Sequence, residues 1–454
     1  MAAQAAQPLH ILFFPSLGQG HLLPIADMAA LFASRGVRCT ILTSPVHAAI
    51  IRPAVDRANH VNTGCPAIDI SVAPDFPDVS SLQKFRQALD LLRKPFHRFL
   101  ADSRPLPDAV VSDAMFHWST AAAAEHGVPR LAFHVGSMFA RCCIGSFLRL
   151  ETTPGGDDDD LVSLPGLPHR IELRRSQMMD PVRMQRSIAA DQGSFGVVIN
   201  SFHELERDYV QHFQGHRAWL VGPVSLACKD MAGRGAGATP AGKDACLEWL
   251  DTKQPGSVVY VSFGTLTSFS PPEQRQIARG LHLSGKNFLW VVAGSSPDES
   301  SWMPPGFAEL ITPQGDRGFI VRGWAPQMLV LNHPAIGAFL THCGWNSTLE
   351  AASAGVPMVT WPRYADQFYN EKLVVEVLKV GVSVGAKDYA SADQTHEVIA
   401  ESIRKLMGCS AIQNKAKHLG VEARKAVENG GSSYDDVGRL IDELMLARRD
   451  KTAH

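Results

Sequence analysis

A repeated alternation of short apolar strands and amphipathic helices is the feature that most limits how this chain can fold. The first unit is an apolar run from Leu9 to Phe14, a loop rich in Gly and Pro, and apolar residues at helical spacing from Ile25 to Phe32. Further strand-like runs lie at residues 37–42, 109–111 and 130–133, with an Ala-rich helical segment at 120–125. Strands and helices in this order predict a parallel, doubly wound sheet.

The same alternation starts again after a stretch that has almost nothing apolar to bury. Residues 229–243 are rich in Gly and Ala, which predicts a surface linker. We therefore expect one α/β domain over residues 1–228 and a second over 244–430. Two similar domains that face each other create a cleft, the usual place for a ligand. The second domain's strand-like runs lie at residues 257–263, 288–292, 318–321, 336–341 and 356–361, and its helical patterns at 272–283 and 346–354.

Composition excludes several other classes of protein. The 454 residues carry 43 Lys and Arg against 45 Asp and Glu, so no basic excess points to nucleic acid. The longest apolar runs are strand-sized, far short of the roughly 20 residues that cross a bilayer, and the N-terminus lacks a secretory pattern. We therefore expect a cytoplasmic protein. Eight cysteines without a CxxC pair predict neither a disulfide framework nor a zinc site, and the acidic run at 157–160 predicts a solvated loop.

The loop after the first strand carries a candidate catalytic residue. Gly18-Gln19-Gly20-His21 is not a dinucleotide fingerprint, because Leu23 occupies the third glycine position and the second strand ends without a ribose-binding acid. His21 remains as a candidate general base, since an imidazole titrates near neutral pH. Asp113 ends another strand and could bind one ring nitrogen, fixing the tautomer and stabilising the imidazolium. Each residue alone could also be structural, His21 as a cap and Asp113 as a turn residue.

The strongest signal lies between Trp324 and Gln367. The segment 341–347 joins a buried strand to a helix, and Gly344 lets a phosphate approach the backbone where free N–H groups favour a pyrophosphate. Glu350 could accept hydrogen bonds from both ribose hydroxyls, and Trp324 offers a flat face to a base. The order of these residues indicates a nucleotide-sugar site, although Trp324 alone could be core and Glu350 a helix-start acid.

This segment resembles, almost position for position, the 44-residue signature box of plant family 1 UDP-sugar glycosyltransferases. The likeness extends over nearly the whole chain, through FFPSLGQGHLLPIADMAALFASRG near the start and CLEWLDTKQPGSVVYVSFGT before the box. It implies the GT-B fold, in which two Rossmann-like doubly wound α/β domains face each other across a cleft. The N-terminal domain would bind the acceptor, the C-terminal domain the UDP-sugar, and residues 431–454 would form a helix that crosses back to the N-terminal domain.

The resemblance also implies roles for individual residues. It places uracil on Trp324 and the backbone of Ala325, and the ribose on Gln327 and Glu350. Phosphate contacts would come from Thr265, His342, Gly344, Asn346 and Ser347. Sugar contacts would come from Trp345, Asp366, Gln367 and Ser137, the last standing where many members have Thr. Acceptor walls would come from an apolar and aromatic set, each of which could instead be core: Phe116, His117, His134, Met138, Phe139 and Tyr364.

Together these implications predict inverting transfer of glucose from UDP-glucose to a hydroxyl of a small lipophilic plant metabolite, such as a flavonoid, another phenolic or a terpenoid. His21 would be the base and Asp113 its partner, with no metal, cofactor or obligate protein partner. A non-catalytic UDP-sugar-binding protein, another UDP-sugar donor, and amine or thiol acceptors remain as alternatives. A glycoside hydrolase would need two carboxylates flanking the scissile bond, and no GxSxG elbow supports a serine hydrolase.

Overall fold

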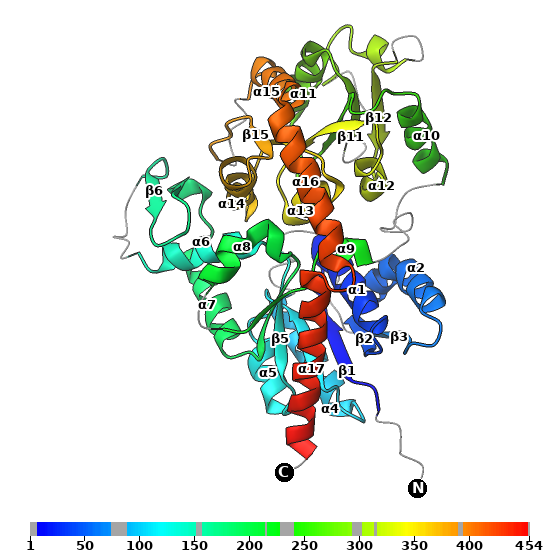
Figure 1. The fold of residues 1–454 in the computed structure, drawn as a ribbon, viewed down its shortest axis with the longest axis vertical. Coiled ribbons are helices and arrows are strands. Elements are labelled where there is room, and N and C mark those ends of the chain that lie inside the picture. The colour runs from blue at the N-terminus through cyan, green and yellow to red at the C-terminus, as the bar shows by residue number, and fades with distance from the viewer. Residues whose placement is uncertain are drawn as a thin grey trace.

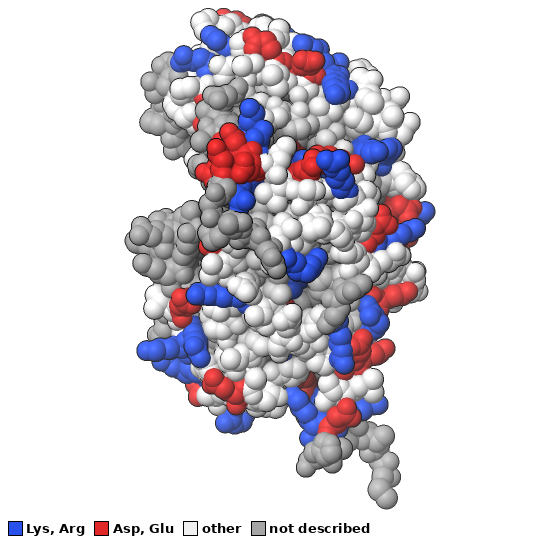
Figure 2. Space-filling model, turned by 90° about the vertical axis from the view of Figure 1, so that its left-hand side faces the viewer, with Lys and Arg blue, Asp and Glu red and all other residues white. Residues whose placement is uncertain are grey.

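Two parallel sheets organise the chain, one in each of two α/β lobes stacked along the long axis (Figure 1). The computed structural model describes residues 7–73, 89–150, 157–213, 216–227, 240–292, 302–312, 316–388 and 394–452. The predicted α/β class with parallel, doubly wound sheets is confirmed. Acidic and basic side chains alternate over the face shown in Figure 2, and its outline is notched where the lobes meet.

The N-terminal lobe is built on a seven-stranded sheet in the order β3-β2-β1-β4-β5-β8-β9. Its central strands are buried on both faces, which is why they read as continuous apolar runs. The chain runs outward from β1 through β2 to β3 and then returns to place β4 on the other side of β1. This reversal is where open α/β sheets bind ligands. The strands are β1 (His10–Phe14), β2 (Arg38–Thr43), β3 (Ile68–Val72), β4 (Ala109–Asp113), β5 (Arg130–His134), β8 (Gly196–Ile199) and β9 (Ala218–Leu220).

The C-terminal lobe repeats the plan with a six-stranded sheet in the order β12-β11-β10-β13-β14-β15. Here the order reverses between β10 and β13, so the loops that follow these two strands lie side by side. The strands are β10 (Val258–Ser262), β11 (Asn287–Val292), β12 (Gly318–Arg322), β13 (Ile336–Thr341), β14 (Met358–Thr360) and β15 (Gly381–Ser383). A small antiparallel pair, β6 (Leu161–Leu164) and β7 (Ile171–Arg174), was not predicted from the sequence.

Helices cover both sheets and join the lobes. In the N-terminal half they are α1 (Gln19–Ala33), α2 (Pro45–Val61), α4 (Arg93–Asp102), α5 (Ser119–Glu125), α6 (Met138–Leu148), α7 (Pro181–Gln192), α8 (His203–His212) and α9 (Val224–Ala227). In the C-terminal half they are α10 (Pro240–Asp251), α11 (Pro271–Ser284), α12 (Gln327–Leu331), α13 (Trp345–Ala354), α14 (Gln367–Lys372), α15 (His396–Gly408), α16 (Ser410–Val427) and α17 (Ser432–Thr452). Within the described residues, no helix combines the length and the hydropathy needed to span a membrane.

The last helix, α17, lies against the N-terminal lobe (Figure 1). Its residues Val437, Leu440 and Leu444 are buried in the same core cluster as β1 and α1. The predicted linker at 229–243 lies mostly outside the described residues, but α10 already begins at Pro240, inside it. The domain boundaries themselves remain predictions.

The lobes also share one buried cluster beside their junction. Met138 and Phe139 at the start of α6 pack with Trp345 of α13 and with Phe368 of α14. Such a shared core resembles the interior of a single domain more than a loose contact between two. One side of the junction is therefore held by apolar packing, and the polar groups of the site lie next to it.

Candidate active site

His21 and Asp113 meet at the reversal point of the N-terminal sheet. His21 lies in the first turn of α1, and Asp113 is the last residue of β4. Because β1 and β4 are paired neighbours, with Phe14 opposite Ser112, the loop after β1 passes beside Asp113. His21 Nδ1 lies 2.6 Å from Asp113 Oδ2. The predicted pair is therefore within hydrogen-bonding distance.

The environment fixes the protonation of this pair. Burial lowers the pKa of His21, but the charge and hydrogen bond of Asp113 outweigh it and raise the pKa above its usual value. For Asp113 burial acts upward, yet His21 and the Met115 backbone N–H hold the pKa below its usual value. An ionised carboxylate only accepts hydrogen bonds, so Nδ1–H donates and Nε2 carries the lone pair. The His21 side chain is 32% exposed, so a substrate can reach part of it.

The phosphate-binding loop of the other lobe is shaped by two glycines around one histidine. A Cβ at Gly264, the residue before Thr265, would lie 2.8 Å from the His342 ring, and a Cβ at Gly344 would lie 2.5 Å from His342 Nε2. Burial lowers the pKa of His342 to about 4, so the imidazole is neutral. Its Nδ1 has no hydrogen-bond partner within the described part of the chain. The loop thus presents a neutral, buried ring with a hydrogen-bonding atom to spare.

Helix α13 starts at this loop without a side-chain cap. Gly344 is its N-cap and makes no capping hydrogen bond, so the first backbone N–H groups remain available to an anion. Asn346 Nδ2 donates to the Gly20 carbonyl at 2.6 Å, directly beside His21. The predicted phosphate site and the predicted base are therefore adjacent, although they lie in different lobes.

The predicted ribose and base contacts also come together. Gln327 Nε2 donates to Glu350 Oε2 at 2.8 Å and to Ser347 Oγ at 3.1 Å. Trp324 is partly exposed at the start of the same loop, whereas Ala325 is buried. The arrangement brings together a carboxylate and an amide that suit a nucleoside, and the partly exposed Trp324 precedes the amide by three residues.

Three residues at the start of α14 form the end of the site that faces His21. Asp366 Oδ2 accepts a hydrogen bond from Asn370 Nδ2 at 2.9 Å, and a Cβ at Gly136 would lie 3.6 Å from it. Gln367 Oε1 accepts from the backbone N–H groups of Arg363 and Tyr364 at 2.8 and 3.0 Å. Within the described chain Gln367 Nε2 has no protein partner. The amide therefore caps its loop with the oxygen and keeps only the NH₂ group for a ligand.

Two predicted sugar contacts have other partners. Trp345 Nε1 donates to the Asn200 carbonyl at 2.7 Å, and its side chain is buried between the lobes. Ser137 caps α6 by accepting from Ala140 N, and it donates to Asn370 Oδ1 at 3.2 Å. The side chains of Trp345 and Ser137 therefore hold the lobes together, and their contact with sugar hydroxyls stays a prediction.

The predicted acceptor walls divide into core and accessible residues. Phe116, Met138 and Phe139 are 0% exposed and belong to apolar clusters, so they are core residues in this structure and their contact with an acceptor stays a prediction. His134 is bound to Asp191 at 2.8 Å between Nε2 and Oδ2. His117 is exposed, and Tyr364 is partly exposed with its hydroxyl 3.4 Å from Thr267 Oγ1.

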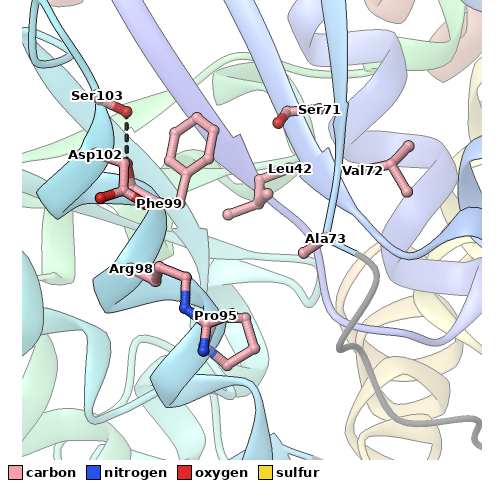
Figure 3. Close-up of a pocket in the computed structure, with 9 residues that line it drawn as sticks. All are labelled: Leu42, Ser71, Val72, Ala73, Pro95, Arg98, Phe99, Asp102 and Ser103. Carbon is pink, nitrogen blue, oxygen red and sulfur yellow. Dashed lines mark hydrogen bonds between the residues drawn. The ribbon is translucent and has the colours of Figure 1, made fainter.

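A groove of about 280 Å³ lies elsewhere on the N-terminal lobe, between the ends of β2 and β3 and helix α4 (Figure 3). Leu42, Val72 and Phe99 give it an apolar lining, and Arg98 and Asp102 supply charge. None of the predicted acceptor residues lines this groove.

Two residues that support the site were not predicted from the sequence. Asn370 stands one helical turn after Asp366, a spacing that could have revealed it, whereas nothing in the sequence pairs Arg130 with Asp113.

Known proteins resemble the chain over nearly its full length. The family model described as "UDP-glucoronosyl and UDP-glucosyl transferase" matches residues 222–412. Scopoletin glucosyltransferase of Nicotiana tabacum is 40% identical, over 96% of this chain and 98% of that protein. The crystal structure of Glycyrrhiza uralensis UGT73P12 complexed with glycyrrhetinic acid 3-O-monoglucuronide aligns with a TM-score of 0.88 at 34% identity, over 98% of this chain and 97% of that chain.

Medicago truncatula UGT71G1, solved in complex with UDP-glucose, aligns with a TM-score of 0.82 at 27% identity, over 96% of this chain and 98% of that chain. These full-length matches confirm the predicted GT-B fold, with its two facing Rossmann-like lobes. The identity and coverage leave no other family to consider, and the chain belongs to the plant family 1 UDP-glycosyltransferases.

Proposed function

We propose that this enzyme transfers glucose from UDP-glucose to a hydroxyl of a small lipophilic plant metabolite, with inversion at the anomeric carbon. The observation that carries the proposal is the 2.6 Å contact between His21 and Asp113, beside the uncapped start of α13. Support for the donor comes from the UDP-glucose complex of a similar protein. Support for a phenolic or terpenoid acceptor comes from relatives named for scopoletin and solved with a glycyrrhetinic acid glucuronide.

In the proposed reaction, His21 Nε2 removes the proton of the acceptor hydroxyl. The oxygen then attacks the anomeric carbon from the face opposite UDP, the bond to the β-phosphate oxygen breaks, and a β-glucoside and UDP result. Asp113 stabilises the imidazolium that forms. The negative charge on the leaving UDP is met by the N–H groups at the start of α13 and by a hydrogen bond from neutral His342.

The same geometry supports the proposed donor contacts. Gln327 and Glu350 would hold the ribose, Trp324 would stack on uracil, and Thr265 would bind a phosphate next to Gly264. Asp366 would accept hydrogen bonds from glucose hydroxyls and the Gln367 NH₂ group would donate one. We further place the reaction in the cytoplasm, since none of the cysteines that the structure describes forms a disulfide.

The test is incubation with UDP-glucose and a panel of phenols, flavonoids and triterpenes, followed by mass spectrometry and by NMR of the anomeric proton. A β-glucoside supports the proposal, and an α-linked product contradicts inversion. His21→Ala should lower the rate by about 10²–10⁴-fold and leave UDP binding intact. UDP-glucose binding by calorimetry without any product from wild type would favour the alternative of a non-catalytic binding protein.

A further inference from the structure

Arg130 lies directly behind the catalytic aspartate. It is the first residue of β5, which pairs in parallel with β4 so that Val110 stands opposite Arg130. From there its long side chain runs along the sheet toward the end of β4 that carries Asp113. Only 2% of the residue is exposed, so its charge is held inside the protein. A buried guanidinium is costly unless its donors are satisfied, and the partners of these donors show what it holds in place.

Its donors fasten the last two residues of β4. Nε donates to Ser112 Oγ at 2.8 Å, and Nη2 donates to the Asp113 carbonyl at 3.3 Å. Ser112 in turn lies 2.8 Å from Ser119 Oγ, which donates to the Phe116 carbonyl. The guanidinium therefore fixes the main chain of Asp113 and the turn that follows it. The carboxylate of Asp113 is left to bind His21 Nδ1 and the Met115 N–H.

The opposite end of the guanidinium is anchored by the last turn of α7 and the residues that follow it. Nη1 donates to Ser194 Oγ at 2.9 Å and lies 3.5 Å from Asp191 Oδ1. Asp191 is 1% exposed, and although burial opposes ionisation, His134, Arg141 and Arg130 lower its pKa to about 2. The anchor is therefore an ionised carboxylate at any pH at which the enzyme works. Arg130 thus bridges a fixed negative charge and the backbone of the catalytic pair.

Charges from several elements act on this pair. Asp113 of β4, Asp366 before α14 and Arg183 of α7 act on His21, the first two favouring its proton and Arg183 opposing it. Arg130 interacts with Asp113, Asp191 and Arg141, and His134 acts on Asp113 from the end of β5. A cation behind Asp113 partly cancels the negative potential that the Asp113 carboxylate produces at the His21 ring. It therefore opposes the proton on His21 and keeps the ring available as a base.

Resting on the proposed role of His21 and Asp113, we propose that Arg130 is a positioning residue for catalysis: anchored by Asp191, it fixes the backbone of Asp113 and limits how tightly the dyad holds its proton. The effect acts through Asp113 and does not involve contact with substrate.

The experiment compares an alcohol that needs a base with a thiol that does not. Arg130→Met should lower transfer to 2-naphthol by about tenfold to a hundredfold, because a small displacement of the dyad is costly. Transfer to 2-naphthalenethiol should change far less, since an aryl thiol is largely ionised near neutral pH without help. With the cation removed, the acid limb of the kcat/KM profile for 2-naphthol should move to higher pH. Arg130→Lys keeps the positive charge, so its acid limb should lie at nearly the same pH as that of wild type.

Arg141→Met is the matched control. Arg141 Nη2 binds the same Asp191 at 2.7 Å and its guanidinium lies over the ring of Phe213, but among the described residues it makes no hydrogen bond to Asp113. The variant should keep the wild-type ratio of alcohol to thiol transfer. An equal fall of that ratio in both variants, or an unmoved acid limb in Arg130→Met, would overturn the proposal, because either result assigns Arg130 to stability alone.

A double variant tests whether an unpaired Asp191, rather than a displaced Asp113, causes the loss. In Arg130→Met/Asp191→Asn the buried carboxylate is neutralised together with its partner. A ratio that stays low supports action through Asp113, whereas a restored ratio would show that an uncompensated Asp191 caused the loss and would contradict the proposal. His21→Ala is measured alongside. If His21→Ala retained alcohol transfer, the assignment of His21 and Asp113 as the catalytic pair would be wrong. If His21→Ala were inactive but Arg130→Met kept the wild-type rate of alcohol transfer, only the role proposed for Arg130 would be wrong.

Discussion

The two lobes build their halves of the site in opposite ways. The donor lobe draws most of its residues from one segment, 324–367, where Gly344 lies against His342 and a helix start supplies N–H groups, and adds Gly264 and Thr265 from the loop after β10. The acceptor lobe joins His21 and Asp113, which lie 92 positions apart, and supports them with buried Arg130 and Asp191. Donor binding therefore depends on local backbone shape, whereas catalysis depends on charges that only the folded sheet brings together.

The largest effect expected from breaking the acceptor half is that of Asp113→Asn. An amide can donate to His21 Nδ1, which would leave the ring proton on Nε2 and remove the base. We expect kcat to fall by about 10²–10⁴-fold with little change in the affinity for UDP-glucose. Because Asp113 raises the pKa of His21, any residual activity should have its acid limb at lower pH than wild type.

A double-mutant cycle checks this dependence. Asp113→Asn in a His21→Ala background should add almost nothing, since the two residues act as one unit. Multiplicative losses would mean that the two side chains act independently and would contradict the dyad. Calorimetry with UDP on all three variants separates catalysis from donor binding.

Breaking the donor half should affect binding instead. A Cβ at Gly344 would lie 2.5 Å from His342 Nε2, and a Cβ at Gly264 would lie 2.8 Å from the same atom. Overpacking of this kind costs about 1–3 kcal/mol, so Gly344→Ala should weaken UDP binding by about tenfold to a hundredfold. Gly408→Ala is the matched control, because a Cβ there meets nothing within 4 Å. A normal Kd for UDP in Gly344→Ala would show that the loop has room to adjust.

This contrast explains which parts of the molecule could be predicted from sequence. The central strands of both sheets and the order of the donor residues follow from local patterns, because a strand, a glycine loop and a helix start are contiguous. The strands β3, β8, β9 and β15, which lie toward the edges of the sheets, were not predicted. The pairing of His21 with Asp113 could be anticipated from adjacent strand ends. The pair β6 and β7 was missed because its strands are short and only partly buried.

Local sequence patterns could not predict the direction in which the side chains of the site point. Trp345 and Gln367 stand where the signature box places sugar contacts, yet the indole of Trp345 points into the interlobe core and the Gln367 oxygen caps a loop. The same holds for two predicted acceptor residues, because Phe116 is buried within the N-terminal lobe and Phe139 in the cluster that the two lobes share. Which face of an element looks into a site depends on packing between distant segments, and the sequence does not record it locally.

Gln367 allows a finer test within the donor half. Gln367→Glu keeps an oxygen to cap the N–H groups of Arg363 and Tyr364 but removes the NH₂ donor, whereas Gln367→Ala removes both. We expect Gln367→Glu to lower kcat/KM for UDP-glucose by about tenfold, the cost of one unpaired buried hydroxyl, with a nearly unchanged Tm. We expect wild type to prefer UDP-glucose over UDP-galactose, and both variants should lose this preference. An unchanged preference in both would remove Gln367 from the sugar site.

The smallest expected effect concerns α17, which follows the donor lobe in sequence but packs on the acceptor lobe. Asp436 of α17 accepts from the Leu220 backbone N–H at 2.8 Å and lies 3.2 Å from His203 Nε2 on α8. The hydrogen bond to Asp436 raises the pKa of His203, against an opposing effect of burial. Protonated His203 therefore stabilises the folded state at a pH below its ordinary value of about 6.5, and this stabilisation is lost as the pH rises through the raised pKa.

His203→Gln should accordingly lower Tm near pH 5.5 and have almost no effect at pH 8.5. Because His203 is 37% exposed, the difference should stay below about 1 kcal/mol. Arg439→Gln is the control, since Arg439 Nη2 lies 2.6 Å from Asp436 Oδ1 and arginine, unlike histidine, does not titrate in this pH range. Its effect on Tm should therefore be similar at both pH values, provided that Asp436, whose pKa is below its usual value, remains ionised. An equal loss of Tm for His203→Gln at both pH values would contradict this prediction. It would mean that His203 supports α17 by packing, and that the charge of His203 does not help to attach the last helix to the acceptor lobe.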